Sequence, residues 1–370
     1  EISACLVGSE MCIRDRGYSD AGMAKGEVKP LIGLTLDGLR RVAEVCGMPR
    51  FAAGQMARWL YEKRVGGIDD MTDLSKGARR RLKDEGYCVG REFPLSEVRS
   101  ADGTAKYLFR GAGGRDVESV FIPDHDRATL CVSSQAGCKM NCSFCMTGRQ
   151  GFHGNLTAAQ IVNQVLSVPG SGDLTNVVYM GMGEPLDNLP AVLDSIEVLT
   201  AKWGLGWSPK RITVSSIGKL RELKRLLDET KVHVAISIHS PFPSERASLM
   251  PVENAFPIIE VIELLQGYDF AHQRRLSFEY TMFKGVNDTQ RHCRELARRL
   301  KGLDCRVNLI RFHAIPGSDL EPSTPQRMEQ FRDALNAEGI IATIRASRGE
   351  DIMAACGMLA GEGVQGRKAK

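Results

Sequence analysis

The sequence has no long apolar run and no recognisable export signal. None of its apolar stretches approaches the roughly 18 residues that a membrane-spanning helix needs. The chain also does not open with a basic segment followed by an apolar core, as a secretory signal would. We therefore expect no membrane partner.

Repeats, low-complexity segments and compositional extremes are missing as well. Hydrophobic residues make up 43% of the 370 positions and charged residues 25%. This ordinary composition excludes a mainly disordered chain, a collagen-like fibre and a coiled coil. The length suits two or three domains, or one barrel with an addition.

Cysteine is too scarce for a disulfide scaffold, with 11 in the whole chain. An odd number without an export signal favours the reducing cytosol, so we expect a cytoplasmic protein. The net charge of +4 is compatible with an RNA partner without demonstrating one. Basic residues gather at 79–83 and at 367–370, where a solvated helix face and a frayed terminus are equally good explanations.

The first 22 residues follow neither a helical nor a strand period, and the chain begins without a methionine. We expect residues 1–22 to be a non-native or disordered leader, with Met23 as the natural start. Cys5 and Cys12 then carry no information about the fold. Residues 361–370 are expected to form a basic tail.

Two regions of different periodicity make up the rest of the chain. Residues 23–95 place apolar side chains at helical spacing, which predicts a small helical accessory domain. In residues 96–360, short β-rich segments are followed by strands that alternate with helices, which predicts a parallel sheet. The sequence therefore predicts an α/β fold, a partial (β/α)6 TIM-like barrel with an N-terminal β extension. Such barrels carry their chemistry on the loops after the strands.

The expected elements can be given by range. Strands are expected at 106–110, 117–122, 129–134, 177–180, 211–215, 233–238, 277–283, 306–310 and 340–344. In the barrel, helices are expected at 190–201, 220–228, 258–265, 290–300 and 326–337, and the accessory domain is expected to have a third helix at 73–87.

Three cysteines, Cys138, Cys142 and Cys145, follow the strand expected at 129–134 with the spacing C-x3-C-x2-C. Structural zinc usually takes four ligands in paired units, and this loop offers three. An inert packed cluster is a poor explanation on so polar a loop. Thiolates are soft ligands for iron, and three of them on a four-iron cube leave one iron open for a reactant.

This spacing, with Phe144 directly before the third cysteine, resembles the radical S-adenosylmethionine (SAM) superfamily. The resemblance implies one [4Fe-4S] cluster held by Cys138, Cys142 and Cys145. It also implies that SAM binds at the open iron and is cleaved to a 5′-deoxyadenosyl radical. The partial barrel is the fold that this superfamily uses.

A Gly-Met-Gly-Glu-Pro turn at 181–185 follows the next strand. Taken alone it is a simple turn, but it resembles the GGEP-type element of the superfamily, in which Gly183 and Glu184 would meet the SAM amino group. Further SAM contacts are expected at the ends of later strands, where satisfied loop polar groups are the alternative. These residues are Ser215, Ser237, Ile238, His239 and His313, the last standing where the family has an asparagine.

Further segments indicate which group within the superfamily the chain resembles, and this resemblance runs from about Leu34 to Ala360. They are 118–123, 130–138, 145–152, 179–188, 307–310 and 349–357. Together they resemble the bacterial dual-specificity adenine-C2 methyltransferases of 23S rRNA and tRNA, the RlmN/Cfr group. The resemblance implies methylation of one adenine in 23S rRNA and of one next to the tRNA anticodon, with two SAM per turnover. We also expect a monomer served by a reducing system such as flavodoxin.

Carbon 2 of adenine is electron-poor and has no lone pair, so it cannot attack the SAM methyl group directly, whereas a thiolate can. The resemblance implies that Cys356 takes a methyl group, which becomes a carbon radical, adds to C2 and crosslinks protein to RNA. Glu118 would then remove the C2 proton. Cys131 would attack the Cys356 sulfur and release methylated RNA as a transient disulfide forms. Alone, each of these residues would be read as ordinary packing or surface.

Three other functions stay open. The motifs do not separate C2 methylation from C8 methylation of the antibiotic-resistance type. A radical SAM enzyme acting on protein or a small molecule, and a zinc or iron–sulfur RNA-binding module, are the more distant alternatives. In every RNA-modifying case the target base must be unstacked and drawn into the barrel mouth, and the helical domain is expected to contact phosphates.

Overall fold

The computed structural model describes residues 28–272 and 274–361. The leader expected at 1–22, with Cys5, Cys12 and Met23, lies outside these ranges, as does the basic tail from residue 362 onward. Within them, no helix combines the length and the apolar character that crossing a bilayer would require.

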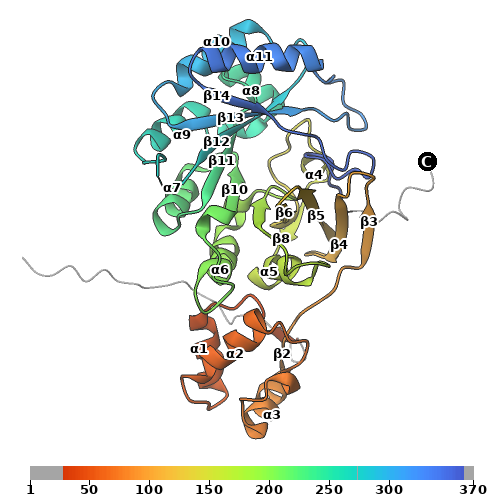
Figure 1. Ribbon diagram of the computed structural model, residues 1–370, viewed down its shortest axis with the longest axis vertical. Coiled ribbons are helices and arrows are strands. Elements are labelled where there is room, and N and C mark those ends of the chain that lie inside the picture. Colours follow the sequence, from red (N-terminus) through yellow and green to blue (C-terminus); the bar gives the residue numbers. More distant parts are fainter. Residues whose placement is uncertain (1–27, 273, 362–370) are drawn as a thin grey trace, which may run out of the picture.

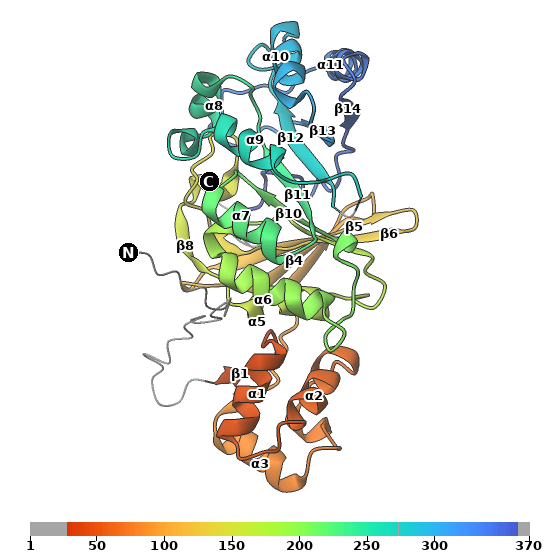
Figure 2. The same cartoon turned by 90° about the vertical axis from the view of Figure 1, so that its left-hand side faces the viewer.

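The N-terminal region forms a small unit of helices (Figures 1 and 2). It contains α1 (Leu36–Val45), α2 (Ala52–Ala57), a π-helical turn η1 (Arg58–Glu62), a 3-10 turn η2 (Ile68–Asp70) and α3 (Lys76–Asp84). Thr35 and Ser75 cap α1 and α3, since their side chains accept hydrogen bonds from Gly38 N and Ala78 N. The cap at Ser75 explains why the third helix begins later than residue 73. A parallel pairing of β1 (Lys29–Pro30) with β2 (Tyr87–Cys88) closes the unit.

A ten-stranded sheet forms the body of the molecule (Figure 1). Its antiparallel part is β3 (Ser96–Arg99), β4 (Ala105–Arg110), β5 (Asp116–Asp124) and β6 (Arg127–Cys131). The parallel part adds β9 (Asn176–Tyr179), β10 (Ile212–Ser216), β11 (His233–Ser237), β12 (Leu276–Met282), β13 (Cys305–Arg311) and β14 (Ile341–Ile344). From β6 to β14 every neighbour pairs in parallel, and β14 and β3 are the two edges. The predicted open α/β barrel of six βα units is confirmed.

Helices cover the outer face of the parallel strands (Figure 2). They are α5 (Ala158–Ser167), α6 (Leu189–Thr200), α7 (Leu220–Glu229), α8 (Pro243–Leu249), α9 (Ile258–Gln266), α10 (Gln290–Leu300) and α11 (Pro325–Ala337). Side chains alternate along each strand. Tyr179 faces α6, where its hydroxyl meets Ser195 Oγ at 2.7 Å. Its neighbours Val178 and Met180 therefore face the barrel interior.

The helical unit packs directly on the barrel. Its apolar core continues into Val162 and Leu166 of α5 and Val198 of α6. Gly33 lies so close to α5 that a Cβ atom there would sit 2.3 Å from Ala159 N, so only glycine fits. This contact fixes the accessory unit to the side of the barrel that α5 and α6 form (Figure 2).

Several local features differ from the sequence expectation, α5 and α8 among them. The helix α5 was not expected, although Thr157 and Gln160 form a capping box at its start, a readable signal. The strand expected at 129–134 ends at Cys131. Backbone bonds still join Val132 to Val178 and Gly181, but at Ser133 the side chain takes part: its Oγ donates to Glu118 O and accepts from Met182 N. The chain can then turn into the short hairpin of β7 (Gln135–Gly137) and β8 (Phe152–Asn155).

Candidate active site

The three clustered cysteines lie between β7 and the short helix α4 (Met146–Arg149). The backbone of this loop is tied down from several sides. Cys138 N donates to Gly151 O at 2.9 Å, and Cys145 N donates to Cys142 O at 3.2 Å. Neighbouring amides of the loop bond to Leu249 O after α8 and to Gly357 O near the C-terminus. Distant parts of the chain therefore hold the cysteine loop in place.

The three thiols interact electrostatically with one another. Burial and then the neighbouring cysteines raise the pKa of Cys142 well above its ordinary value, and Arg246 opposes that shift. Burial raises the pKa of Cys138 to about 12, with Cys145 adding to it. None of the three is in a disulfide. They form one group of soft donors close enough to affect one another's ionisation.

This donor set fits a four-iron cube better than a single metal ion. No three Cys, His, Asp or Glu side chains in the described ranges converge closely enough to hold one ion, as a structural zinc site requires. A cube spreads its thiolate ligands over different irons. Arg246, which is fully buried, adds a positive charge that favours the thiolate form beside it. The residues present therefore suit a [4Fe-4S] cluster.

The Gly-Met-Gly-Glu-Pro turn follows β9 and contacts both Gln135 of the cysteine hairpin and Ile217 after β10. Gly183 has φ +96, and a Cβ there would meet Gln135 Cβ at 2.4 Å, so the turn requires glycine. Glu184 N donates to Gln135 Oε1 at 2.8 Å. The Glu184 carboxylate is buried and accepts from Leu186 N and Ile217 N, both at 3.1 Å. Burial raises the pKa of Glu184 to about 7.

Ser215 and Ser237 both face the barrel interior. The register pairs Ser215 with Ala235 and Ser237 with Glu279, which places them in successive interior layers. Ile238 is fully buried, and its carbonyl accepts from Arg246 Nε at 3.2 Å. Its amide donates to Glu279 O at 3.1 Å, so both backbone groups of Ile238 are bonded within the protein.

His239 lies against the cysteine loop, since its ring meets Phe144 edge-on at 4.8 Å. Its Nδ1 accepts from Thr281 N at 2.9 Å. The ring is therefore neutral, with its proton on Nε2. Burial, and then Arg246, lower the pKa of His239 to about 3, so the ring stays neutral at physiological pH.

His313 is buried and lies just after β13. Its Nε2 lies 3.1 Å from Ser347 Oγ. Its Nδ1 lies 3.4 Å from a Glu350 carboxylate oxygen and makes no hydrogen bond within the described chain. A buried polar atom without a partner is costly, and a bound ligand would satisfy it.

The structure brings Cys131 and Cys356 together from distant parts of the chain. The two thiols interact electrostatically, and both also interact with Arg345. Burial raises the pKa of Cys131 to about 12. Cys356 is an exposed residue, yet surrounding protein desolvates its thiol and raises its pKa, while Arg345 lowers it. Cys145 also interacts with Cys356, so the pair borders the cysteine loop.

The segment 353–361, which carries Cys356, is tied to the same site. Thr147 Oγ1 donates to Leu359 O at 2.8 Å, and Gln150 Nε2 donates to Ala360 O at 2.6 Å. Glu118 Oε2 accepts from the amides of Ala360 and Gly361 at 2.8 and 3.2 Å. Glu118 thus contacts the segment that carries Cys356, and the same segment bonds to Thr147 and Gln150 directly after the cysteine loop.

Sequence reasoning missed a polar network inside the barrel. Glu279 Oε1 accepts from Asn308 Nδ2 at 2.7 Å and from Ser277 Oγ at 3.0 Å, and its other oxygen lies 3.3 Å from Arg345 Nη1. Alternation along β12 and β13 could have placed Glu279 and Asn308 inside, but no spacing signal links them to Arg345. The network connects the barrel interior to the thiol pair.

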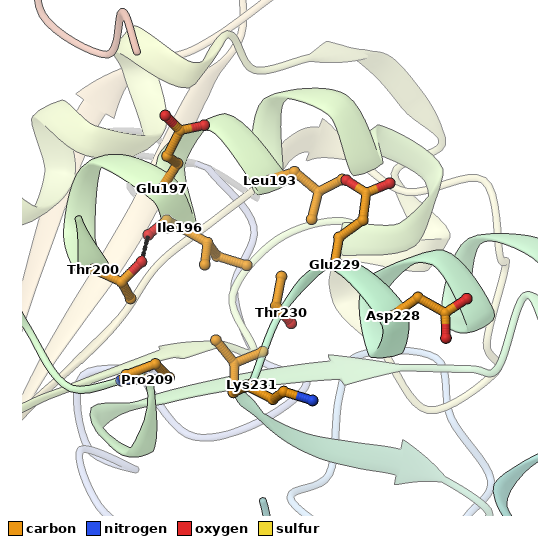
Figure 3. A pocket seen from close by; sticks show the side chains of 10 residues that line it. Leu193, Ile196, Glu197, Thr200, Pro209, Asp228, Glu229, Thr230 and Lys231 are labelled. Carbon is orange, nitrogen blue, oxygen red and sulfur yellow. Dashed lines mark hydrogen bonds between the residues drawn. The ribbon is translucent and has the colours of Figure 1, made fainter. Parts of the chain in front are cut away.

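The remaining cysteines of the barrel are separate from this site. Cys293 and Cys305 are buried in the apolar core, as expected for structural residues. A cavity of about 320 Å³ opens on the outside of the barrel between α6 and α7 (Figure 3). Leu193, Ile196 and Lys231 are among its lining residues, and it contains none of the predicted site residues.

Two family models match the chain. One, described as "Radical SAM superfamily", matches residues 132–298. The other, described as "Ribosomal RNA large subunit methyltransferase N-terminal domain", matches residues 29–87.

Individual relatives match over most of the chain. A Bacteroides fragilis protein named "Probable dual-specificity RNA methyltransferase RlmN" is 60% identical over 330 residues, covering 89% of this chain and 96% of that protein. The "Dual-specificity RNA methyltransferase RlmN" of Desulfotalea psychrophila is 42% identical over 342 residues, covering 89% and 94%. The crystal structure of a radical SAM methyltransferase from Sphaerobacter thermophilus superposes with a TM-score of 0.84 at 39% identity, covering 90% of this chain and 100% of that one.

Proposed function

From its membership of the RlmN family of dual-specificity radical SAM RNA methyltransferases, to which the chain belongs, we propose that this protein methylates carbon 2 of adenine in 23S rRNA and in tRNA next to the anticodon. Two observations support the proposal: the thiols of Cys131 and Cys356 interact with each other, and Glu118 bonds to the amides of Ala360 and Gly361 in the segment that carries Cys356. Methylation of an electron-poor carbon needs both an intermediate methyl carrier and a way to release the product.

The cofactors are assigned to the residues whose geometry suits them. Cys138, Cys142 and Cys145 would hold the [4Fe-4S] cluster. When bound, the cluster and SAM supply a methyl group and a 5′-deoxyadenosyl radical, with two SAM consumed per turnover. The SAM contacts would come from Gly183, Glu184, Ser215, Ser237, Ile238, His239 and His313. Among these, the unpartnered Nδ1 of His313 is the atom whose surroundings most directly call for a ligand.

Cys356 would carry the methyl group as S-methylcysteine. Its thiolate is the nucleophile, and Arg345 favours that charged form. After hydrogen is removed from the S-methyl group, the new carbon radical would bond to C2 and link Cys356 to the RNA, and the adduct radical would give up one electron, for which the cluster left oxidised by SAM cleavage would be the acceptor. Glu118 would then take the C2 proton. Its carboxylate oxygens now bond to Lys106 and to the backbone of the Cys356 segment.

Cys131 would release the product. Its thiolate attacks the Cys356 sulfur, an S–S bond forms, and the bond from Cys356 sulfur to the methylene carbon breaks, after which the carbon takes a proton. The disulfide must then be reduced by two electrons, which the thiol pool of the cytoplasm can supply. A separate reducing system such as flavodoxin would serve the cluster. We propose that the protein acts as a monomer and that its helical unit contacts RNA phosphates.

An anaerobic assay with 23S rRNA and tRNA transcripts, SAM and reductant tests this function, with the methylated nucleosides separated by chromatography and identified by mass spectrometry. The expected product is 2-methyladenosine in both RNAs. Mainly 8-methyladenosine would assign the protein to C8 methylation instead. SAM cleavage without RNA methylation would point to a different substrate.

A further inference from the structure

We propose that Lys106 is a positioning residue for Glu118, which compensates the charge of that carboxylate and holds it in a fixed place relative to the segment that carries Cys356. This inference rests on the proposed role of Glu118 as proton acceptor. Lys106 lies in β4, outside every motif that the family resemblance uses.

The sheet register brings the two residues onto one face. Lys106 pairs with Val120, and Glu118 pairs with Leu108, so Lys106 and Glu118 are diagonal neighbours across β4 and β5. Val120 in turn pairs with Cys131 in β6. Directly paired residues share a face of the sheet, so Lys106, Glu118 and Cys131 lie on the same side.

The contact between the two side chains is short and buried. Lys106 Nζ lies 2.9 Å from Glu118 Oε1. Lys106 is 8% exposed and Glu118 is 1% exposed. A carboxylate removed from water remains charged only beside a compensating partner, and otherwise it becomes protonated. The ammonium of Lys106 is the charged partner that the buried Glu118 carboxylate has, and it holds Oε1 in a fixed position.

A second contact of Lys106 reaches the Cys356 segment. Its Nζ lies 3.5 Å from Met353 O. Glu118 holds the same segment from the other end, through the amides of Ala360 and Gly361. One ammonium therefore links the proton acceptor to the chain segment that carries the RNA adduct.

Stability alone does not account for this pair. Two charges buried together give up hydration that their attraction only partly restores, and apolar residues of similar size often do as well or better. A buried pair beside reactive thiols is better explained by a requirement for charge at that place. The exposed pair of Lys284 and Glu321, with an N···O distance of 2.7 Å, has no such surroundings and provides a matched control.

The test compares Lys106→Met, Lys106→Arg, Glu118→Gln and the double variant Lys106→Met/Glu118→Gln, with Lys284→Met as control. Each reconstituted enzyme is mixed anaerobically with a 23S rRNA transcript, SAM and reductant. Mass spectrometry measures S-methylation of Cys356, and denaturing gels follow the decay of the covalent protein–RNA adduct.

Lys106→Met is expected to methylate Cys356 like the unmodified protein but to resolve the adduct at least about tenfold more slowly, a modest part of what a general base contributes. Lys106→Arg keeps the charge and should resolve it nearly normally. In the Glu118→Gln background, Lys106→Met should have no further effect, because it acts through Glu118. The control should match the unmodified protein.

Normal adduct decay in Lys106→Met, or an additional slowing in the double variant, would overturn the role of Lys106 while leaving that of Glu118 intact. Normal decay in Glu118→Gln would instead overturn the proton-acceptor role, and the Lys106 proposal would fall with it. Thermal unfolding of the cofactor-free proteins checks folding. Should Lys106→Met not fold, Lys106→Gln, which is neutral but can donate a hydrogen bond, replaces it under the same criteria.

Discussion

The thiols of Cys131 and Cys356 interact with each other and with the same cation, Arg345. Because a negative charge on Cys356 raises the pKa of Cys131, the two thiols do not readily ionise together. The first thiolate would form at the more exposed Cys356. Once a methyl group has neutralised that sulfur, the electrostatic opposition to a thiolate at Cys131 disappears. The pair is thus suited to react in order, with Cys356 as the first thiolate and Cys131 as the second.

Replacing Arg345 by Met should slow methylation of Cys356 by roughly tenfold near neutral pH, because less of the thiol is ionised once the cation is removed. Arg345 lowers the pKa of Cys356, so its removal raises that pKa and moves the pH profile of methylation toward higher pH. Arg345→Lys keeps the charge, so its pH profile of methylation should shift less than that of Arg345→Met. Quantifying S-methylcysteine by mass spectrometry across pH measures this. An unchanged profile in Arg345→Met would show that the cation does not activate the thiol.

Replacing Cys145 by Ala should abolish the iron–sulfur chromophore after anaerobic reconstitution, because one of the three ligands is lost. Cys293→Ala is the matched control, since Cys293 is buried in α10 with its Sγ 3.9 Å from Phe331 O. It should keep full absorbance and iron content. Full iron content in Cys145→Ala would refute the assignment of the ligands.

Glu184 should make the folded, cofactor-free protein less stable as pH rises from about 4.5 to about 7. Its pKa is raised from 4.5 to about 7 on folding, so the folded state binds the extra proton in that window. The associated loss is at most about 3 kcal/mol. Glu184→Gln cannot ionise, so its stability relative to the unmodified protein should increase across the window. Denaturant unfolding at several pH values measures this, and parallel curves for the two proteins would contradict it.

Gly183→Ala should destabilise the fold by about 1–3 kcal/mol. The new Cβ would meet Gln135 at 2.4 Å, at a backbone φ of +96. Gly170→Ala separates the two causes, since Gly170 also has positive φ but open space around it. Thermal unfolding should show a clearly larger loss of stability for Gly183→Ala than for Gly170→Ala. Equal effects would mean that the close approach to Gln135 contributes nothing.

Much of the architecture could be predicted, because strand and helix periods are local properties of the sequence. The six βα units and the position of the cysteine loop after a strand follow from such patterns. The partners of Glu118 could not be predicted in this way. The contact of Glu118 with Lys106 depends on the register of β4 against β5. Its contact with Ala360 depends on how the C-terminal segment returns across the barrel.

The end of β6 shows a second limit of local patterns. Residues 129–134 are β-rich, and backbone bonds continue at Val132, but the regular strand ends at Cys131 and Ser133 bonds through its side chain to Glu118 O and Met182 N. Gln164 of α5 completes the replacement by accepting from Ser133 N at 2.8 Å. A residue that exchanges ladder bonds for side-chain bonds is recognised only once its partners are placed.

Trapping the RNA on Cys131→Ala tests the central claim most directly. The variant is incubated anaerobically with a 23S rRNA transcript, SAM and reductant, digested, and analysed by mass spectrometry. The expected result is an adenosine joined through one methylene carbon to Cys356, with little free methylated RNA. Normal release of methylated RNA without an adduct, or an adduct on another residue, would contradict the roles assigned to Cys356 and Cys131.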